Sequence, residues 1–141
     1  MDTDDATFLF AFESCTLPRS EWTHRAHLRM AYLYFRDIPD AETVLPNVRQ
    51  RIRNFNEANR NRKGYHETIT AAFLHLVADR MRQKPAQTFA EFEDKNADLF
   101  APGGDALLRH YERETLFSPE ARARFVPPDR IPLPEPPLSA V

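Results

Sequence analysis

The stretch WTHRAHLRMAYLYF, residues Trp22–Phe35, gives the clearest indication of the fold of this 141-residue chain. Its apolar residues recur every three or four positions, which is the period of one face of an α-helix. Ser20 and Thr23 are both favourable N-cap residues just before the pattern begins. The stretch therefore predicts a helix that carries His24 and His27 in its first turn.

The same period recurs along the rest of the chain, while the alternating pattern of a strand is almost absent. Further helices are expected over residues 5–14, after Asp40, over residues 65–83, and after Thr88, Asp105 and Ser118. The chain has only three glycines, which cannot form the Gly-rich loop of a dinucleotide-binding fold or a P-loop. These patterns predict an all-α protein, a single compact domain of about six or seven helices.

Length and composition are consistent with one domain that needs no covalent cross-link. A chain of this length buries roughly 68–70% of its unfolded surface, and 42% of its residues are hydrophobic. Cys15 is the single cysteine, which excludes an intramolecular disulfide. Six of the sixteen residues from Val126 to Val141 are proline, a composition typical of extended, polyproline-like chain. We therefore expect a helical domain over residues 1–126 and a proline-rich extended tail over residues 127–141.

Charge and hydropathy narrow the class of partner. The net charge of −2 argues against a nucleic-acid-binding protein. No window approaches about 18 consecutive apolar residues, so no membrane span is expected. The first residues lack the basic segment and the long apolar run of a secretion signal, which favours a cytoplasmic location. A local basic run from Arg49 to Lys63 is interpreted as a solvated helix face, with a phosphate- or carboxylate-bearing partner as the alternative.

A second histidine motif lies in the stretch GYHETITAAFLHL, residues Gly64–Leu76, at the head of another apolar helix. Backbone N–H groups at a helix start carry partial positive charge, which favours neutral imidazole, the form that binds metals or accepts a proton. If the two histidine-bearing helices pack together, three imidazoles and a carboxylate converge, a set that suits zinc, iron, nickel or manganese. The predicted catalytic residues are His24, His27, His66 and Glu67, and the three histidines are also the predicted metal ligands.

Each of these residues also has a simpler interpretation. A histidine at a helix start often caps the helix or donates to a nearby carbonyl, and then serves packing alone. Glu67 would either orient an imidazole or act as a base. Trp22 and Tyr65 closely precede the two motifs, where their rings would line a cofactor-binding pocket or belong to the core. The H-x-x-H spacing is a weak metal signal by itself, since helical zinc motifs use i, i+4.

Three strings, WTHRAHL, GYHETIT and LFSPEARARFVPPD, resemble those of a family of small bacterial helical proteins. Members of that family carry W-T-H-x-A-H-L and G-Y-H-E-T motifs, and an S-P-E-A-R string followed by a proline-rich end. The resemblance covers most of the chain, from about Phe8 to Pro134. It implies a similar short helical protein and carries no activity that could be transferred.

Two functional hypotheses follow from the sequence. The first is a small helical enzyme or ligand-binding protein with a histidine-rich pocket between two helix N-termini. In this hypothesis the histidines bind a divalent metal or serve as acid/base groups, and the protein acts on a small polar organic molecule. The second is a non-catalytic interaction module, in which the histidines are structural and the tail docks a partner or a second copy of the chain.

Overall fold

The computed structural model describes residues 3–38, 40–61 and 64–134. Over these residues the chain forms seven α-helices and three 3-10 helices and no strand, which confirms the predicted all-α single domain. The elements in order are α1 (Thr3–Glu13), η1 (Arg19–Glu21), α2 (His24–Asp37), α3 (Ala41–Ala58), α4 (Glu67–Gln83), α5 (Phe89–Lys95), η2 (Ala97–Phe100), η3 (Pro102–Arg109), α6 (Arg113–Leu116) and α7 (Pro119–Ala123). None of the helices in these ranges is long and apolar enough to cross a membrane.

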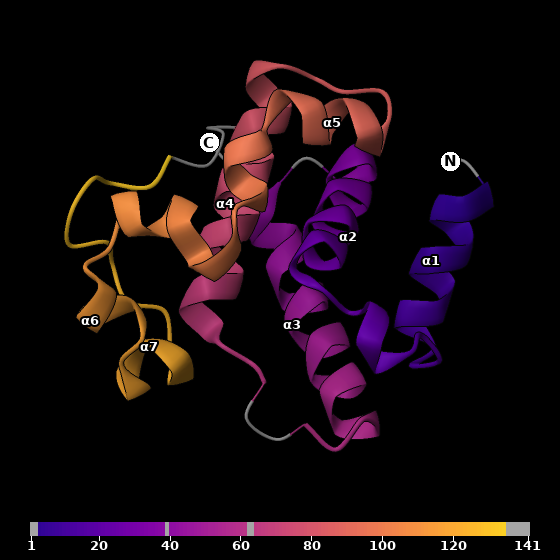
Figure 1. Ribbon diagram of the computed structural model, residues 1–141, viewed down its shortest axis with the longest axis horizontal. Coiled ribbons are helices and arrows are strands. Elements are labelled where there is room, and N and C mark those ends of the chain that lie inside the picture. Colours follow the sequence, from indigo (N-terminus) through magenta and orange to yellow (C-terminus); the bar gives the residue numbers. More distant parts are fainter. Residues whose placement is uncertain (1–2, 39, 62–63, 135–141) are drawn as a thin grey trace.

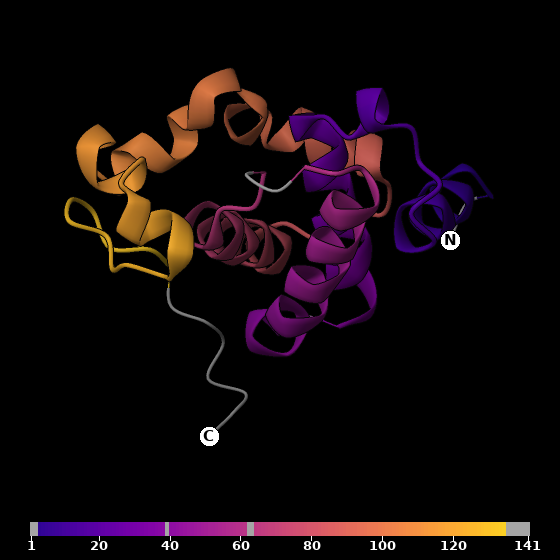
Figure 2. The ribbon, with the colours of Figure 1, turned by 90° about the horizontal axis from the view of Figure 1, so that it is seen from below.

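Helices α2, α3 and α4 pack against one another and form the centre of the domain (Figure 1). On one side α1 covers α2 and α3, and on the other side α7 packs against α4. The view from below shows the segment from α5 to η3 arching over the ends of the central helices (Figure 2). Large side chains such as Phe12, Tyr32, Phe55 and Phe92 are fully buried between these layers. This core fixes the relative positions of the starts of α2 and α4.

Side-chain caps begin the helices at most of the predicted places. Thr23 accepts a hydrogen bond from the Ala26 N–H at the start of α2. Asp40, Thr88 and Ser118 cap α3, α5 and α7 in the same way. Each cap satisfies a backbone donor that a helix start leaves free, which is why this local signal predicts helix starts well.

The region after α5 departs from the prediction. The helix expected after Asp105 is instead a 3-10 helix that already begins at Pro102. Three short elements were not predicted at all, namely η1, η2 and α6. They have three or four residues each, which is too short for an apolar period to be recognised.

The first part of the predicted tail, residues 127–134, forms no helix and lies against the domain. The Arg130 N–H donates to the His110 carbonyl at 2.9 Å, and the His110 Nδ1–H donates to the Ile131 carbonyl at 2.8 Å. Asp129 accepts hydrogen bonds from the Glu112 N–H and the Thr115 hydroxyl. The remainder of the predicted tail, residues 135–141, lies outside the described residues.

Candidate functional site

The start of α2 opens onto a cavity of about 290 Å³ between α2, α3 and α4. Because Thr23 is the N-cap, His24 is the first helical residue and His27 follows one turn later. Both imidazoles line this space, which we call the apolar cavity. Its other walls are mainly apolar side chains such as Ile52 and Phe73, and Thr70 contributes the third polar side chain.

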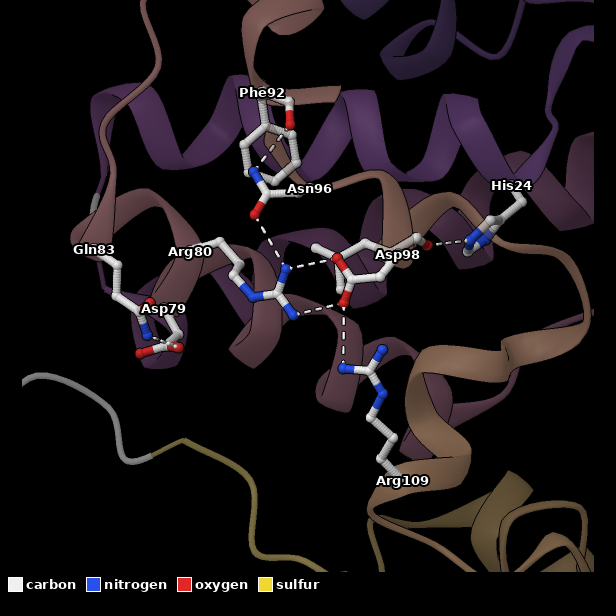
Figure 3. A network of polar contacts seen from close by, with 9 residues as sticks. His24, Asp79, Arg80, Gln83, Phe92, Asn96, Asp98 and Arg109 are labelled. Carbon is white, nitrogen blue, oxygen red and sulfur yellow. Dashed lines mark hydrogen bonds and ion pairs between the residues drawn. The ribbon is translucent and has the colours of Figure 1, made fainter. Parts of the chain in front are cut away.

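His24 reaches across to the segment after α5. Its Nε2–H donates to the Leu99 carbonyl at 2.9 Å, and its ring lies edge-on to Phe73, 5.1 Å between centroids. A carbonyl oxygen can only accept, so the Nε2 of His24 carries a proton in this contact. Figure 3 shows the His24 ring directed toward the backbone that follows Asp98.

An ion-pair network holds that backbone in place (Figure 3). The Arg80 guanidinium donates to both Asp98 carboxylate oxygens at 2.8 Å and to the Asn96 side-chain oxygen at 3.1 Å. The Arg80 hydrogen bonds hold the pKa of Asp98 below its ordinary value. Because Leu99 follows Asp98 directly, this network positions the carbonyl that His24 uses.

His27 is a neutral imidazole with one nitrogen unused. Its Nδ1–H donates to the Thr23 carbonyl at 2.7 Å. Burial lowers the pKa of His27 to about 4, against the opposing effect of that hydrogen bond. Every fully buried side-chain nitrogen or oxygen among the described residues has a hydrogen-bond partner. The Nε2 of His27 has no such partner there, so this nitrogen is not fully enclosed and is accessible to water.

Trp22 supports His27 and does not itself line the apolar cavity. The two rings lie 3.8 Å apart between centroids. The indole also stacks on Phe12 at 4.4 Å and contacts Phe55 at 5.3 Å. Trp22 therefore fixes the orientation of the His27 ring against α1 and α3, and its predicted role as a cofactor-binding residue stays a prediction.

His66 requires a correction. The predicted helix start at residue 65 is two residues too early, since α4 begins at Glu67 and His66 is its N-cap. The His66 Nδ1 accepts from the Ile69 N–H at 3.1 Å, and its Nε2–H donates to the Leu116 carbonyl at 2.7 Å. Both ring nitrogens of this buried side chain are thus occupied by backbone groups, and burial lowers its pKa. No lone pair is left for a metal.

Glu67 was expected to orient an imidazole or to act as a base, and its contacts differ from both. Its carboxylate accepts two hydrogen bonds from Arg49, at 2.9 and 2.6 Å, and one from the Tyr65 hydroxyl at 2.5 Å. The Arg49 hydrogen bonds hold the pKa of Glu67 below its ordinary value despite burial. The ion pair joins α3 to α4. Tyr65 completes it, with the Arg53 guanidinium 4.9 Å above its ring.

The structure therefore brings together two of the three predicted metal ligands. His24 and His27 share the apolar cavity, while His66 and Glu67 are engaged elsewhere. Among the described residues no group of three His, Cys, Asp or Glu side chains could hold a metal ion. Protein zinc sites use three or four such ligands, so these donors do not fit a tightly held ion. Occupancy of a two-histidine site by zinc, iron, nickel or manganese stays a prediction.

A polar stripe runs along the last turns of α3 and into the residues that follow it. Arg49, Arg53 and Asn56 follow one another at steps of four and three residues, which places them on one side of α3, and Arg60 lies just beyond its last residue, Ala58. Arg49 binds Glu67, and the other three line a second cavity. The three arginines belong to the basic run from Arg49 to Lys63, for which a solvated helix face was expected, with a phosphate- or carboxylate-bearing partner as the alternative.

No protein-family model, curated protein or solved structure matches the chain. The resemblance seen in the three sequence strings therefore stays a prediction.

Proposed function

We propose that the protein binds a small, mainly apolar organic molecule in the apolar cavity, where His27 Nε2 accepts a hydrogen bond from it. The observation that carries this proposal is a neutral imidazole with an unused nitrogen at the wall of an apolar space. Ligand sites commonly combine apolar walls with a few placed polar groups. The sequence favoured a polar molecule, whereas these walls favour a more apolar one.

The dimensions of the cavity support a ligand of modest size. Its volume of about 290 Å³ is roughly twice that of an engineered apolar cavity of about 150 Å³ that binds benzene. Three polar side chains line it, namely His24, His27 and Thr70. A molecule with one aromatic ring or a short aliphatic chain, and one hydroxyl or amine donor, satisfies both the size and the chemistry.

The protonation state of His27 favours binding over proton transfer. A general base works best when its pKa lies near the working pH, and the pKa of His27 is lowered to about 4. At neutral pH the ring is therefore an uncharged hydrogen-bond acceptor. The proposed function is therefore ligand binding. Catalysis at the same site would require a bound molecule that raises the pKa of His27.

Phenol and toluene are suitable probes, since they have similar shapes and differ in one donor. Each is titrated into the wild-type protein and into His27→Leu, and binding is followed by NMR of backbone amides. His110→Leu is the matched control, because His110 also donates to a carbonyl but does not line the apolar cavity. Ala31→Leu adds volume to the cavity wall and is expected to weaken both probes.

The expected result is a preference for phenol that depends on His27. On His27→Leu, the ratio of the toluene Kd to the phenol Kd should fall at least about fivefold, the equivalent of one hydrogen bond. Phenol should also shift the Nε2 nitrogen signal of His27 in the wild type, a readout that requires no variant. Absence of saturable binding of either probe, or an unchanged ratio in His27→Leu, would contradict the proposal.

The alternative function, an interaction module that uses its proline-rich end, depends in part on residues 135–141, outside the described chain. It predicts that a partner, or a second copy of this chain, binds the full-length protein and not a chain ending at Pro134. Sedimentation analysis of both lengths tests the self-association form of this hypothesis.

A further inference from the structure

A second cavity, of about 700 Å³, is lined by residues at the end of α3 and just before α4. We call it the polar cavity. It is lined by Arg53, Asn56, Glu57, Arg60, Asn61 and Tyr65. None of these residues lines the apolar cavity, so the two spaces are chemically and structurally separate.

Asn56 is the feature of this cavity that packing alone does not explain. Its side chain is buried, with 7% of the residue exposed, and its amide has no hydrogen-bond partner among the described residues. A fully enclosed amide atom would appear as an unsatisfied buried group, and the described residues contain none. The Asn56 amide must therefore be reachable through the cavity that it lines.

Buried polar groups are normally hydrogen-bonded, so an amide that faces a cavity takes its partner from water or from a bound molecule. The side-chain amide is not needed to end α3, because the backbone carbonyl of Asn56 already accepts a hydrogen bond from the Asn61 N–H at 2.7 Å. A bound polar group would supply the missing partner.

Two arginines with available guanidinium groups accompany this amide. The Arg53 guanidinium lies over the ring of Tyr65. Neither Arg53 nor Arg60 forms an ion pair with another described residue. A guanidinium group presents a planar fork of N–H donors that matches a carboxylate or a phosphate. The cavity thus combines two cationic forks with one buried amide.

Two features oppose an anion, and both make the inference testable. Glu57 lines the same cavity with a negative charge. The cavity also lies beside the carbonyl end of α3, which carries partial negative charge. Cations at such an end can serve the helix alone, so the role of the arginines has to be separated from helix stability.

We propose that the polar cavity is a second ligand site, which binds small organic anions through a carboxylate or phosphate group. The anionic group contacts Arg53 and Arg60, and the Asn56 amide donates to it from the buried side. This site is independent of the proposed ligand in the apolar cavity.

The test is an NMR titration of the full chain with inorganic phosphate in one arm and succinate in the other. Sodium chloride holds the ionic strength constant, and the side-chain NH₂ signal of Asn56 is the direct readout. Arg53→Gln, Arg60→Gln and Glu57→Gln are compared with Arg36→Gln. Arg36 is the matched control, since it is an exposed arginine in the last turn of α2 and does not line the cavity.

We expect at least one of the two anions to shift the Asn56 signal saturably, and the tighter one identifies the recognised group. Each of Arg53→Gln and Arg60→Gln should weaken that binding at least about fivefold, Glu57→Gln should strengthen it, and Arg36→Gln should leave it unchanged. The proposal is overturned if chloride alone moves the Asn56 signal equally. It is also overturned if the two arginine variants melt at lower temperature but bind the anion as the wild type does.

Discussion

Replacing His66 by alanine should destabilise the protein without affecting the apolar cavity. The change removes two hydrogen bonds at once, the cap of the Ile69 N–H and the bond to the Leu116 carbonyl. Loss of an N-cap costs about 0.5–2 kcal/mol, and a buried carbonyl without a partner costs about 1–3 kcal/mol. We expect the free energy of unfolding to fall by about 2–4 kcal/mol, which lowers the Tm by roughly 10 °C in a chain of this size.

His66→Asn separates the two contributions. Asparagine is a good N-cap residue and its side-chain oxygen can accept from the Ile69 N–H, but the shorter side chain leaves the Leu116 carbonyl without its donor. The unfolding free energy of His66→Asn should therefore lie between those of wild type and His66→Ala. Urea unfolding followed by circular dichroism gives all three values under the same conditions.

The binding assay decides between a cap and a ligand-contacting histidine. Below their melting temperatures, both His66 variants should bind phenol as the wild type does, whereas His27→Leu should lose the preference for phenol over toluene. If the three histidines acted as one site, as the sequence suggested, His66→Ala would reduce the preference for phenol over toluene as His27→Leu does. That outcome, or an unchanged urea midpoint in His66→Ala, would refute the interpretation of His66 as a cap.

Three further predictions concern pH and the C-terminal segment. Because the folded pKa of His27 is about 4 and its ordinary value is 6.5, the unfolded chain takes up the proton first as pH falls. Stability should decline from about pH 6.5 to about pH 4, by up to about 3 kcal/mol, and His27→Gln should decline less in urea titrations at stepped pH. Glu67→Gln should lower the unfolding free energy at pH 7 by about 1.5–3 kcal/mol. The difference in unfolding free energy between wild type and this variant should become smaller in acid, because the lowered pKa of Glu67 adds stability that is lost as the pH falls through that pKa. A chain ending at Pro134 should keep the wild-type Tm, whereas one ending at Pro128 should melt at a lower temperature because it lacks the contacts of residues 129–131.

The features that the sequence predicted are those that depend on neighbouring residues. Thr23 and Ser118 cap helices whose starts lie within three residues of them, and the apolar period of α2 is contained in one stretch. Such local signals suffice for the helical fold and for most helix starts.

The arrangement of the candidate site could not be predicted in the same way. His66 binds a carbonyl 50 residues away, and His24 binds one 75 residues away. Nothing in the spacing of the motifs indicates those partners, and once His66 is occupied the predicted three-histidine centre cannot form. The apolar cavity likewise depends on side chains of three helices, which only the tertiary packing brings together.

The two histidine contacts also have a consequence for the order of folding during synthesis. At the start of α2, His24 donates to the Leu99 carbonyl, and at the start of α4, His66 donates to the Leu116 carbonyl. The ribosome adds Leu99 and Leu116 well after the residues of these two helices. Contacts of such long sequence separation slow folding, because a large loop must close before they form. Until residue 116 has emerged, His66 cannot form its hydrogen bond to the Leu116 carbonyl, and the start of α4 lacks that tertiary contact. We expect arrest of translation before that point to leave a protease-sensitive helical intermediate, and a chain extended past α7 to become resistant.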